Sequence, residues 1–170
     1  MTMRDLLATL LLVAILGPAR IAHAEFADSE VGARGMALGG AFVAVDGDPA
    51  SLFWNPAAIL SDRRVQVAGM RTRLFDGLDG VSEDFVGLTV GLDEDLGLGF
   101  GWTRVGLEDI YHEDVLTGAV ARRFGDAWQV GVSVLFFGAD APGYEALNDP
   151  NFVGRQWKVS GSVGALYRWN

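Results

Sequence analysis

The 170-residue sequence contains no cysteine, and its 13 Lys and Arg residues are outnumbered by 22 Asp and Glu residues. The absence of cysteine excludes disulfide bonds, thiolate metal sites, iron–sulfur clusters and a cysteine nucleophile. A net charge of −9 with scattered basic residues provides no dense basic patch for a phosphate backbone, so we expect no nucleic acid among the partners. Hydrophobic residues make up 50% of the chain, which excludes the composition typical of intrinsic disorder. The length favours one domain.

Long apolar runs are also missing, apart from one near the N-terminus. Leu6 to Leu16 are almost continuously apolar, follow a basic start and precede the small-residue pattern Ala22-His23-Ala24. This run is too short to span a bilayer as a helix, which needs about 20 apolar residues, and its layout is typical of a signal peptide. We therefore predict a signal peptide over residues 1–24. No later segment has 18 uncharged apolar residues, so only a β-barrel could span a membrane.

Beyond Arg63, apolar residues recur at every second position, which is typical of strands with one apolar face. In the segment 96–106, for example, Leu98, Phe100 and Trp102 alternate with glycines and a threonine. Tight turns between the expected strands alternate with longer links, as they do in outer-membrane barrels. The expected strands are approximately residues 64–73, 83–92, 96–106, 113–124, 127–138 and 156–169.

These patterns predict an all-β fold, an antiparallel up-and-down transmembrane β-barrel segment over residues 63–170. Trp157 and Tyr167 bracket the apolar face of the last strand, ten residues apart. At about 3.3 Å per residue and a tilt of about 40°, this separation projects to roughly 25 Å, the height of the apolar band in such barrels. The alternative is a secreted soluble β-sandwich that acts as a binding protein, because its strands also alternate.

The expected number of strands is too small for a closed barrel. Single-chain bacterial barrels have at least eight strands, whereas the period-two pattern indicates about six. We therefore expect an incomplete or open barrel, and the sequence to be the first part of a larger one. Several chains that share one barrel are the alternative.

Residues 25–62 differ in composition and are predicted to form a short helical hatch, or plug. Asp48 precedes Pro49 in the way that an N-cap residue precedes a helix opening with proline. Asn55-Pro56 then starts a second short turn. Glycines at 97, 99 and 101 on the inner face of the third strand would let this segment approach closely, although they could instead serve strand bending. We infer a plug packed inside the sheet.

No residue pattern indicates catalysis. His112 is the one histidine beyond the expected signal peptide, and we expect it in a solvated external link without the spacing of a metal site. Ser133 and Ser160 lack the context of a serine nucleophile, and Asp46-Gly47-Asp48 lacks the other ligands of a calcium loop. We therefore predict no enzymatic activity, no catalytic residues, no metal and no cofactor.

The hatch segment contains a recognisable motif. A Gly-Ala-Phe-x-Ala run at Gly40 to Ala44 is followed by Asp48-Pro49 and by an aromatic-Asn-Pro-Ala group at Trp54 to Ala57. Over about 30 residues this pattern resembles the start of PorV/PorQ-like outer-membrane proteins, which belong with FadL-like transporters of hydrophobic compounds. Gly47 departs from the pattern, because the family more often has a second acidic residue there. The structural residues of the motif are Gly35, Gly39, Gly40, Phe42, Asp48, Pro49, Asn55, Pro56 and Ala57.

The resemblance implies localisation in the cell outer membrane, with membrane lipid as a partner and a hatch in the barrel lumen. PorV/PorQ-like proteins serve protein export and surface attachment, which would add secretion-system components as partners. FadL-like proteins carry hydrophobic small molecules, and for that alternative Phe42, Phe53 and Trp54 are candidate hydrophobic-ligand contacts. Packing within the hatch is the more common role of such aromatics. We expect a non-enzymatic barrel of the PorV/PorQ type.

Overall fold

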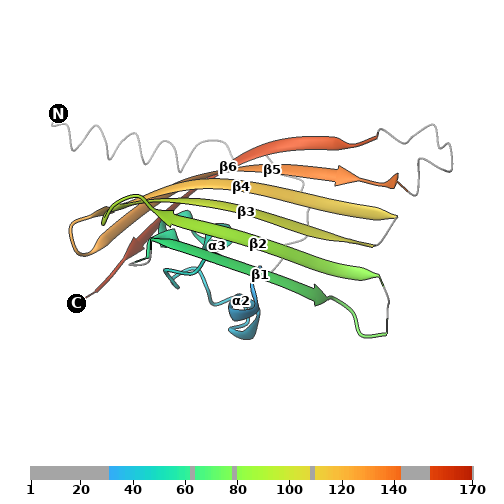
Figure 1. Ribbon diagram of the computed structural model, residues 1–170, viewed down its shortest axis with the longest axis horizontal. Helices are drawn as coiled ribbons and strands as arrows, with labels where there is room; N and C mark the ends of the chain where they lie inside the picture. The colour runs from blue at the N-terminus through green and yellow to red at the C-terminus, as the bar shows by residue number, and fades with distance from the viewer. Residues whose placement is uncertain (1–30, 62–63, 78–79, 108–109, 143–153, 170) are drawn as a thin grey trace, which may run out of the picture.

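The computed structural model describes residues 31–61, 64–77, 80–107, 110–142 and 154–169. The expected signal peptide, residues 1–24, and the first residues of the expected hatch lie outside the described residues. Figure 1 shows one open antiparallel sheet with the N-terminal helices gathered on one side of it. The strands follow one another in chain order across the sheet, so the predicted all-β, up-and-down fold is confirmed. Within the described residues, no helix has the length and apolar character to cross a membrane.

The strands are close to the expected segments, with differences at their ends. They are β1 Val65–Arg73, β2 Val81–Gly91, β3 Leu96–Leu107, β4 Tyr111–Phe124, β5 Trp128–Asp140 and β6 Gln156–Tyr167. The expectation that His112 lies in a link is wrong, because it belongs to β4 and pairs with Gly106 of β3 and Asp140 of β5. The backbone ladder continues here where the apolar alternation has already ended, since ladder hydrogen bonds do not require apolar side chains.

The register carries the two faces of each strand across the whole sheet. We call the face away from the hatch the outward face. One lateral row on it consists of Val65, Val90, Leu98, Val120, Val132 and Val163. The neighbouring row on the opposite face consists of Gln66, Thr89, Gly99, Ala119, Ser133 and Ser162. One face is therefore apolar and the other small or polar, as the alternation predicts.

The described part of the hatch contains three short helical elements: α2 Ala33–Ala37, α3 Ser51–Trp54 and the 3₁₀ helix η1 Pro56–Ile59. Helix α3 begins at Ser51 and not at Pro49 as expected, because Pro49 and Ala50 form a turn that leads into it. Asp48 opens this turn, since its Oδ1 accepts from the Ala50 N–H at 2.9 Å and its carbonyl accepts from the Ser51 N–H at 2.9 Å. The expected second turn is present as η1.

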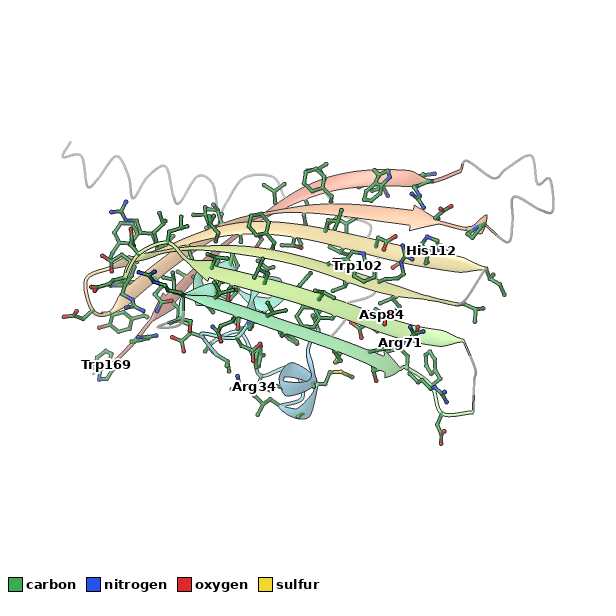
Figure 2. The ribbon with its side chains drawn as sticks, in the orientation of Figure 1. Arg34, Arg71, Asp84, Trp102, His112 and Trp169 are labelled. Atoms are coloured by element: carbon green, nitrogen blue, oxygen red, sulfur yellow. The ribbon has the colours of Figure 1, made fainter. Side chains whose placement is uncertain are left out.

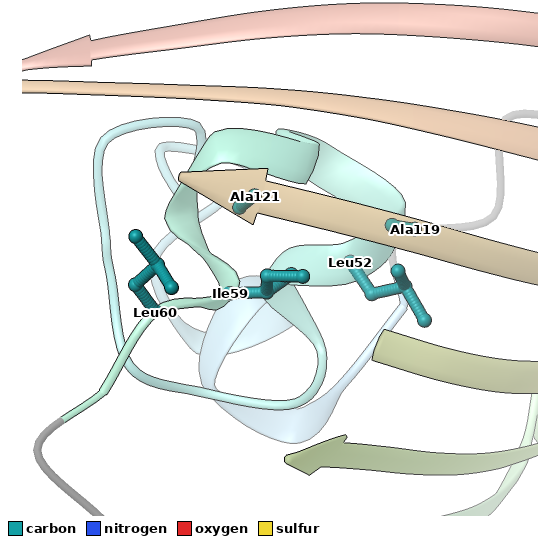
Figure 3. Close-up of a cluster of buried hydrophobic side chains, with 5 residues drawn as sticks. All are labelled: Leu52, Ile59, Leu60, Ala119 and Ala121. Carbon is teal, nitrogen blue, oxygen red and sulfur yellow. The ribbon is translucent and has the colours of Figure 1, made fainter. Parts of the chain in front are cut away.

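The core lies between the hatch and the small-residue face of the sheet. Figure 3 shows one part of it, in which three hatch residues meet two alanines of β4: Leu52, Ile59, Leu60, Ala119 and Ala121. A second cluster joins the hatch to β2 and consists of Val31, Phe42, Ala50 and Phe85. A third joins η1 to β6 through Ala57, Ala58 and Leu166. The hatch thus packs beneath most of the sheet.

The glycines of β3 provide the space for this packing. A Cβ at Gly97 would lie 2.8 Å from the Leu60 side chain, and one at Gly101 would lie 2.6 Å from the ring of Phe53. A larger residue at either position would require the Leu60 or Phe53 side chain to shift. The glycine spacing in β3 therefore correctly predicts where the hatch approaches.

Candidate functional site

The Asn55-Pro56-Ala57 segment sits in a notch formed by two glycines that pair directly, Gly131 of β5 and Gly164 of β6. A Cβ at Gly131 would overlap the carbonyl carbon and oxygen of Pro56. A Cβ at Gly164 would overlap Asn55 Oδ1. Because backbone atoms form part of this contact, only glycine allows the hatch to lie so close. Neither glycine stands out in the sequence, although both occupy inward positions of their strands.

Asn55 is the hydrogen-bonding centre of this notch. Its Oδ1 accepts from the Ala57 N–H at 3.0 Å, and so caps η1. Its Nδ2 donates to the Val43 carbonyl at 3.0 Å and to the Ala165 carbonyl of β6 at 3.2 Å. One nearly buried side chain therefore joins two parts of the hatch to the sheet.

Further polar contacts tie the hatch to both edges of the sheet. At one edge, Gln66 of β1 donates from Nε2 to the Gly47 carbonyl at 3.0 Å. At the other edge, Arg168, just past the end of β6, forms an ion pair with Asp46. Within the hatch, Arg34 binds Asp48 at 2.7 Å. The hatch is thus held at β1 and β6, and not only at its covalent junction with β1.

The glycines of the predicted motif are needed for two different reasons, a close approach of another side chain or a positive φ. Gly35 is buried, and a Cβ there would lie 3.0 Å from the Trp54 ring. Gly39 and Gly40 have φ values of 60° and 81°, which L side chains rarely adopt. A Cβ at Gly39 would have no atom within 4 Å, so its role is conformational and does not involve a close approach.

The three candidate ligand-contact aromatics all make packing contacts. Phe42 is fully buried and meets Trp54 edge to face, with ring centroids 5.9 Å apart. Phe53 meets Phe85 of β2 in the same way at 5.7 Å. Trp54 donates from Nε1 to the Val31 carbonyl at 2.9 Å. These contacts favour the hatch-packing role over direct contact with a hydrophobic ligand.

The outward face of the sheet is apolar and exposed. Its large residues include Val67, 71% exposed, and Val163, 78% exposed, on the two edge strands. The exposed apolar residues on the central strands include Val86, Phe100, Leu116, Val120, Val132, Val134 and Phe136. The hatch lies against the opposite face, so none of the described elements covers this surface.

Aromatic residues gather at one end of the outward face. Trp128 and Tyr167 are paired across β5 and β6, with ring centroids 4.8 Å apart, and Trp169 lies 6.0 Å from Tyr167. In Figure 2, Trp169 lies at the opposite end of the sheet from Arg71 and His112. Trp157 of β6 lies near that second end and covers Gly138 of β5.

Charged residues follow the apolar rows at this second end. Arg104 donates from Nε and Nη2 to the two oxygens of Asp114, at 2.8 and 2.9 Å. Trp102 also donates to Asp114, at 2.9 Å. His112, expected in solvent, is instead partly buried, with Nε2 3.9 Å from Asp114 and 3.8 Å from Asp140. The polar cluster therefore begins one row beyond the apolar residues of β3 and β4.

Chemistry-bearing residues do not converge elsewhere in the described part of the chain. No group of three or more His, Asp or Glu side chains there is arranged to hold a metal ion. Ser133 faces the hatch and is buried. Comparison of the chain with models of protein families, with characterised proteins and with solved structures gave no match.

Proposed function

We propose that this chain forms the wall and hatch of a non-enzymatic outer-membrane β-barrel protein of the PorV/PorQ-like type. The observation that carries the proposal is the outward apolar face, which extends over all the described strands and which no described element covers. Soluble monomers rarely expose contiguous apolar patches larger than a few hundred Å². Lipid removes the cost of that exposure, and the strand ladder satisfies the backbone hydrogen bonds that lipid cannot.

The position of the hatch weighs against the secreted sandwich. In a β-sandwich the covering layer packs on the apolar face of the sheet. Here the covering segment packs on the small-residue face, against Gly97, Gly101 and Gly131, and leaves the apolar face open. That is the arrangement expected of a barrel wall with lipid outside and a plug inside.

The order of residues along the strands gives further support. Trp157 and Tyr167 are both 50% exposed and bracket Val159 and Val163 on β6. Aromatic girdles on either side of an apolar band are typical of outer-membrane strands. The charged residues that follow the band would then lie among lipid headgroups.

A lipid environment also requires that the two free sheet edges be paired. Among the described strands, β1 pairs only with β2, and β6 pairs only with β5. An unpaired edge leaves backbone groups without partners in the hydrocarbon. The proposal therefore includes closure by further strands of a longer polypeptide or by other copies of the chain.

The role in protein export or surface attachment rests on the resemblance of the hatch motif to PorV/PorQ-like proteins. The packing of Phe42, Phe53 and Trp54 supports that role over the transport of hydrophobic compounds, because a ligand at these rings would have to displace existing contacts. A hatch whose aromatic side chains are already packed against one another suits a scaffold more than a channel.

The test is a deletion strain complemented with tagged full-length protein. We expect the protein in the outer-membrane fraction after a carbonate wash, and we expect the deletion to abolish export of surface proteins without changing uptake of hydrophobic substrates. Recovery in the soluble periplasmic fraction would overturn the membrane proposal in favour of the sandwich. Normal export with lost uptake would favour the FadL-like role.

A further inference from the structure

We propose that Arg71, Arg73 and Arg104 form a binding site for the phosphate group of an anionic lipid on the outward face of the sheet. The inference rests on the proposed function, since it places the outward face in a membrane. It adds a specific lipid contact that the motif resemblance does not imply.

The three arginines line one hollow of about 630 Å³ at the end of the sheet farther from Trp169. The register places Arg71, Asp84 and Arg104 in one lateral row of the outward face, and Arg73, Ser82 and Gly106 in the next. A Cβ at Gly106 would lie 2.8 Å from the Cα and Cβ atoms of His112, so His112 packs closely on Gly106 and forms one wall of the hollow. Figure 2 shows Arg71, Asp84 and His112 at this same end of the molecule.

The guanidinium groups that line the hollow have N–H donors beyond those that bind the neighbouring carboxylates. Arg104 is held by Asp114 through two hydrogen bonds, so it is fixed in place. Arg71 lies 3.7 Å from Asp84, beyond a direct hydrogen bond, and its side chain is 72% exposed. Arg73 makes no ion pair or side-chain hydrogen bond within the described residues. Asp140 also lies beside this site and is paired with Arg155, so four arginines stand against three carboxylates, an excess of one positive charge, although the whole chain has a net charge of −9.

The site adjoins the apolar band at the depth where a phosphate headgroup would lie. The row next to Arg71, Asp84 and Arg104 consists of Gly69, Val86, Trp102, Leu116, Phe136 and Val159. A lipid whose acyl chains lie along this row would place its headgroup about two residues, or roughly 7 Å, farther along the strands. The planar guanidinium fork of arginine matches phosphate geometry and binds it with two hydrogen bonds. The apolar surface for the acyl chains and the basic surface for the phosphate are therefore adjacent, as the binding of one phospholipid requires.

The test compares two lipids that differ only in the phosphate, phosphatidic acid and diacylglycerol with the same acyl chains. Native mass spectrometry of the detergent-solubilised full-length protein measures each adduct for the wild type and for Arg71→Gln/Arg73→Gln. We expect the double variant to bind phosphatidic acid about tenfold more weakly, from the loss of two charge-assisted contacts, with no change for diacylglycerol. Arg122→Gln is the matched control, because Arg122 lies on the outward face near the opposite end, above the Phe124 ring. We expect it to change binding less than twofold.

Equal loss in Arg122→Gln, or equal binding of the two lipids by the wild type, would overturn the proposed site. Full displacement of phosphatidic acid by millimolar inorganic phosphate would also overturn it, by showing a free-anion site. Flotation with phosphatidylcholine vesicles separates this proposal from the function on which it rests. Flotation of the wild type, together with equal binding of phosphatidic acid and diacylglycerol in the mass spectrometry, removes only the lipid site, whereas failure of the wild type to float removes the membrane function.

Discussion

Individual glycines in this protein serve different purposes, and their surroundings show which ones can be replaced. Gly131 and Gly164 admit the backbone of Asn55-Pro56-Ala57. Gly39 supplies a positive φ in open space. Gly118 of β4 does neither, because a Cβ there would meet no atom within 4 Å and its φ is not positive. The same substitution should therefore have different effects at these positions.

We expect Gly131→Ala to loosen the hatch. The added methyl would overlap the Pro56 backbone, which cannot rotate away as a flexible side chain can. Overpacking of this kind typically costs about 1–3 kcal/mol. Limited proteolysis of residues 31–61 measures the change, and we expect faster cleavage in Gly131→Ala while Gly118→Ala stays like the wild type. Equal protection in both variants would mean that the notch does not hold the hatch.

Positions along each strand of the outward face differ in their depth within the proposed membrane. On β5, Val134 lies in the middle of the apolar band and pairs with Gly118 and Gly161. Val130 lies closer to the aromatic end and pairs with Arg122, so that row already contains an arginine. The two positions share a strand, a face and a residue type. They differ in their depth within the proposed membrane.

We expect Val134→Arg to impair membrane insertion far more than Val130→Arg. An arginine costs about 2–4 kcal/mol at the midplane of the bilayer and about 0–1 kcal/mol near its interfaces. The measurement is the urea dependence of folding into vesicles for the two variants of the full-length protein. If the outward face instead meets water, both substitutions will be tolerated alike.

At the scale of the whole molecule, the hatch spans a sheet that remains open. Gln66 holds it at the β1 edge, and Asn55 and Arg168 hold it at the β6 edge. Most of the stabilising contacts therefore join residues far apart in sequence, as with the ion pair between Asp46 and Arg168.

Hydrogen exchange can establish whether the edges are paired in the membrane. We expect the backbone amides of β1 and β6 in the membrane-embedded full-length protein to exchange as slowly as those of β3, which has a partner on each side. The control is the same protein in urea, where all strands should exchange quickly. Rapid exchange confined to β1 and β6 in the membrane would show that the sheet remains open there.

The sequence alone was sufficient to predict the strands and which of their residues share a face. The period-two pattern predicts all the strands within a few residues, because a half-buried strand needs apolar side chains at alternate positions whatever its neighbours are. Asn55 could likewise be recognised as a capping residue, since its Oδ1 accepts from the Ala57 N–H, only two residues away, whereas Asp48 opens a turn and does not cap α3. Both are local effects, determined within a short stretch of chain.

The tertiary structure alone decided what meets across the sheet. The pairing of Gly131 with Gly164 beneath Pro56, and the gathering of Arg71, Arg73 and Arg104 in one hollow, depend on register between strands. The placement of His112 in β4 also depends on pairing with β3 and β5, since its own neighbours show no alternation. Register is set by contacts between residues distant in the sequence, and a shift of one residue would reverse every face. For this reason the sequence predicted the hatch and the antiparallel sheet, but not the notch that joins them.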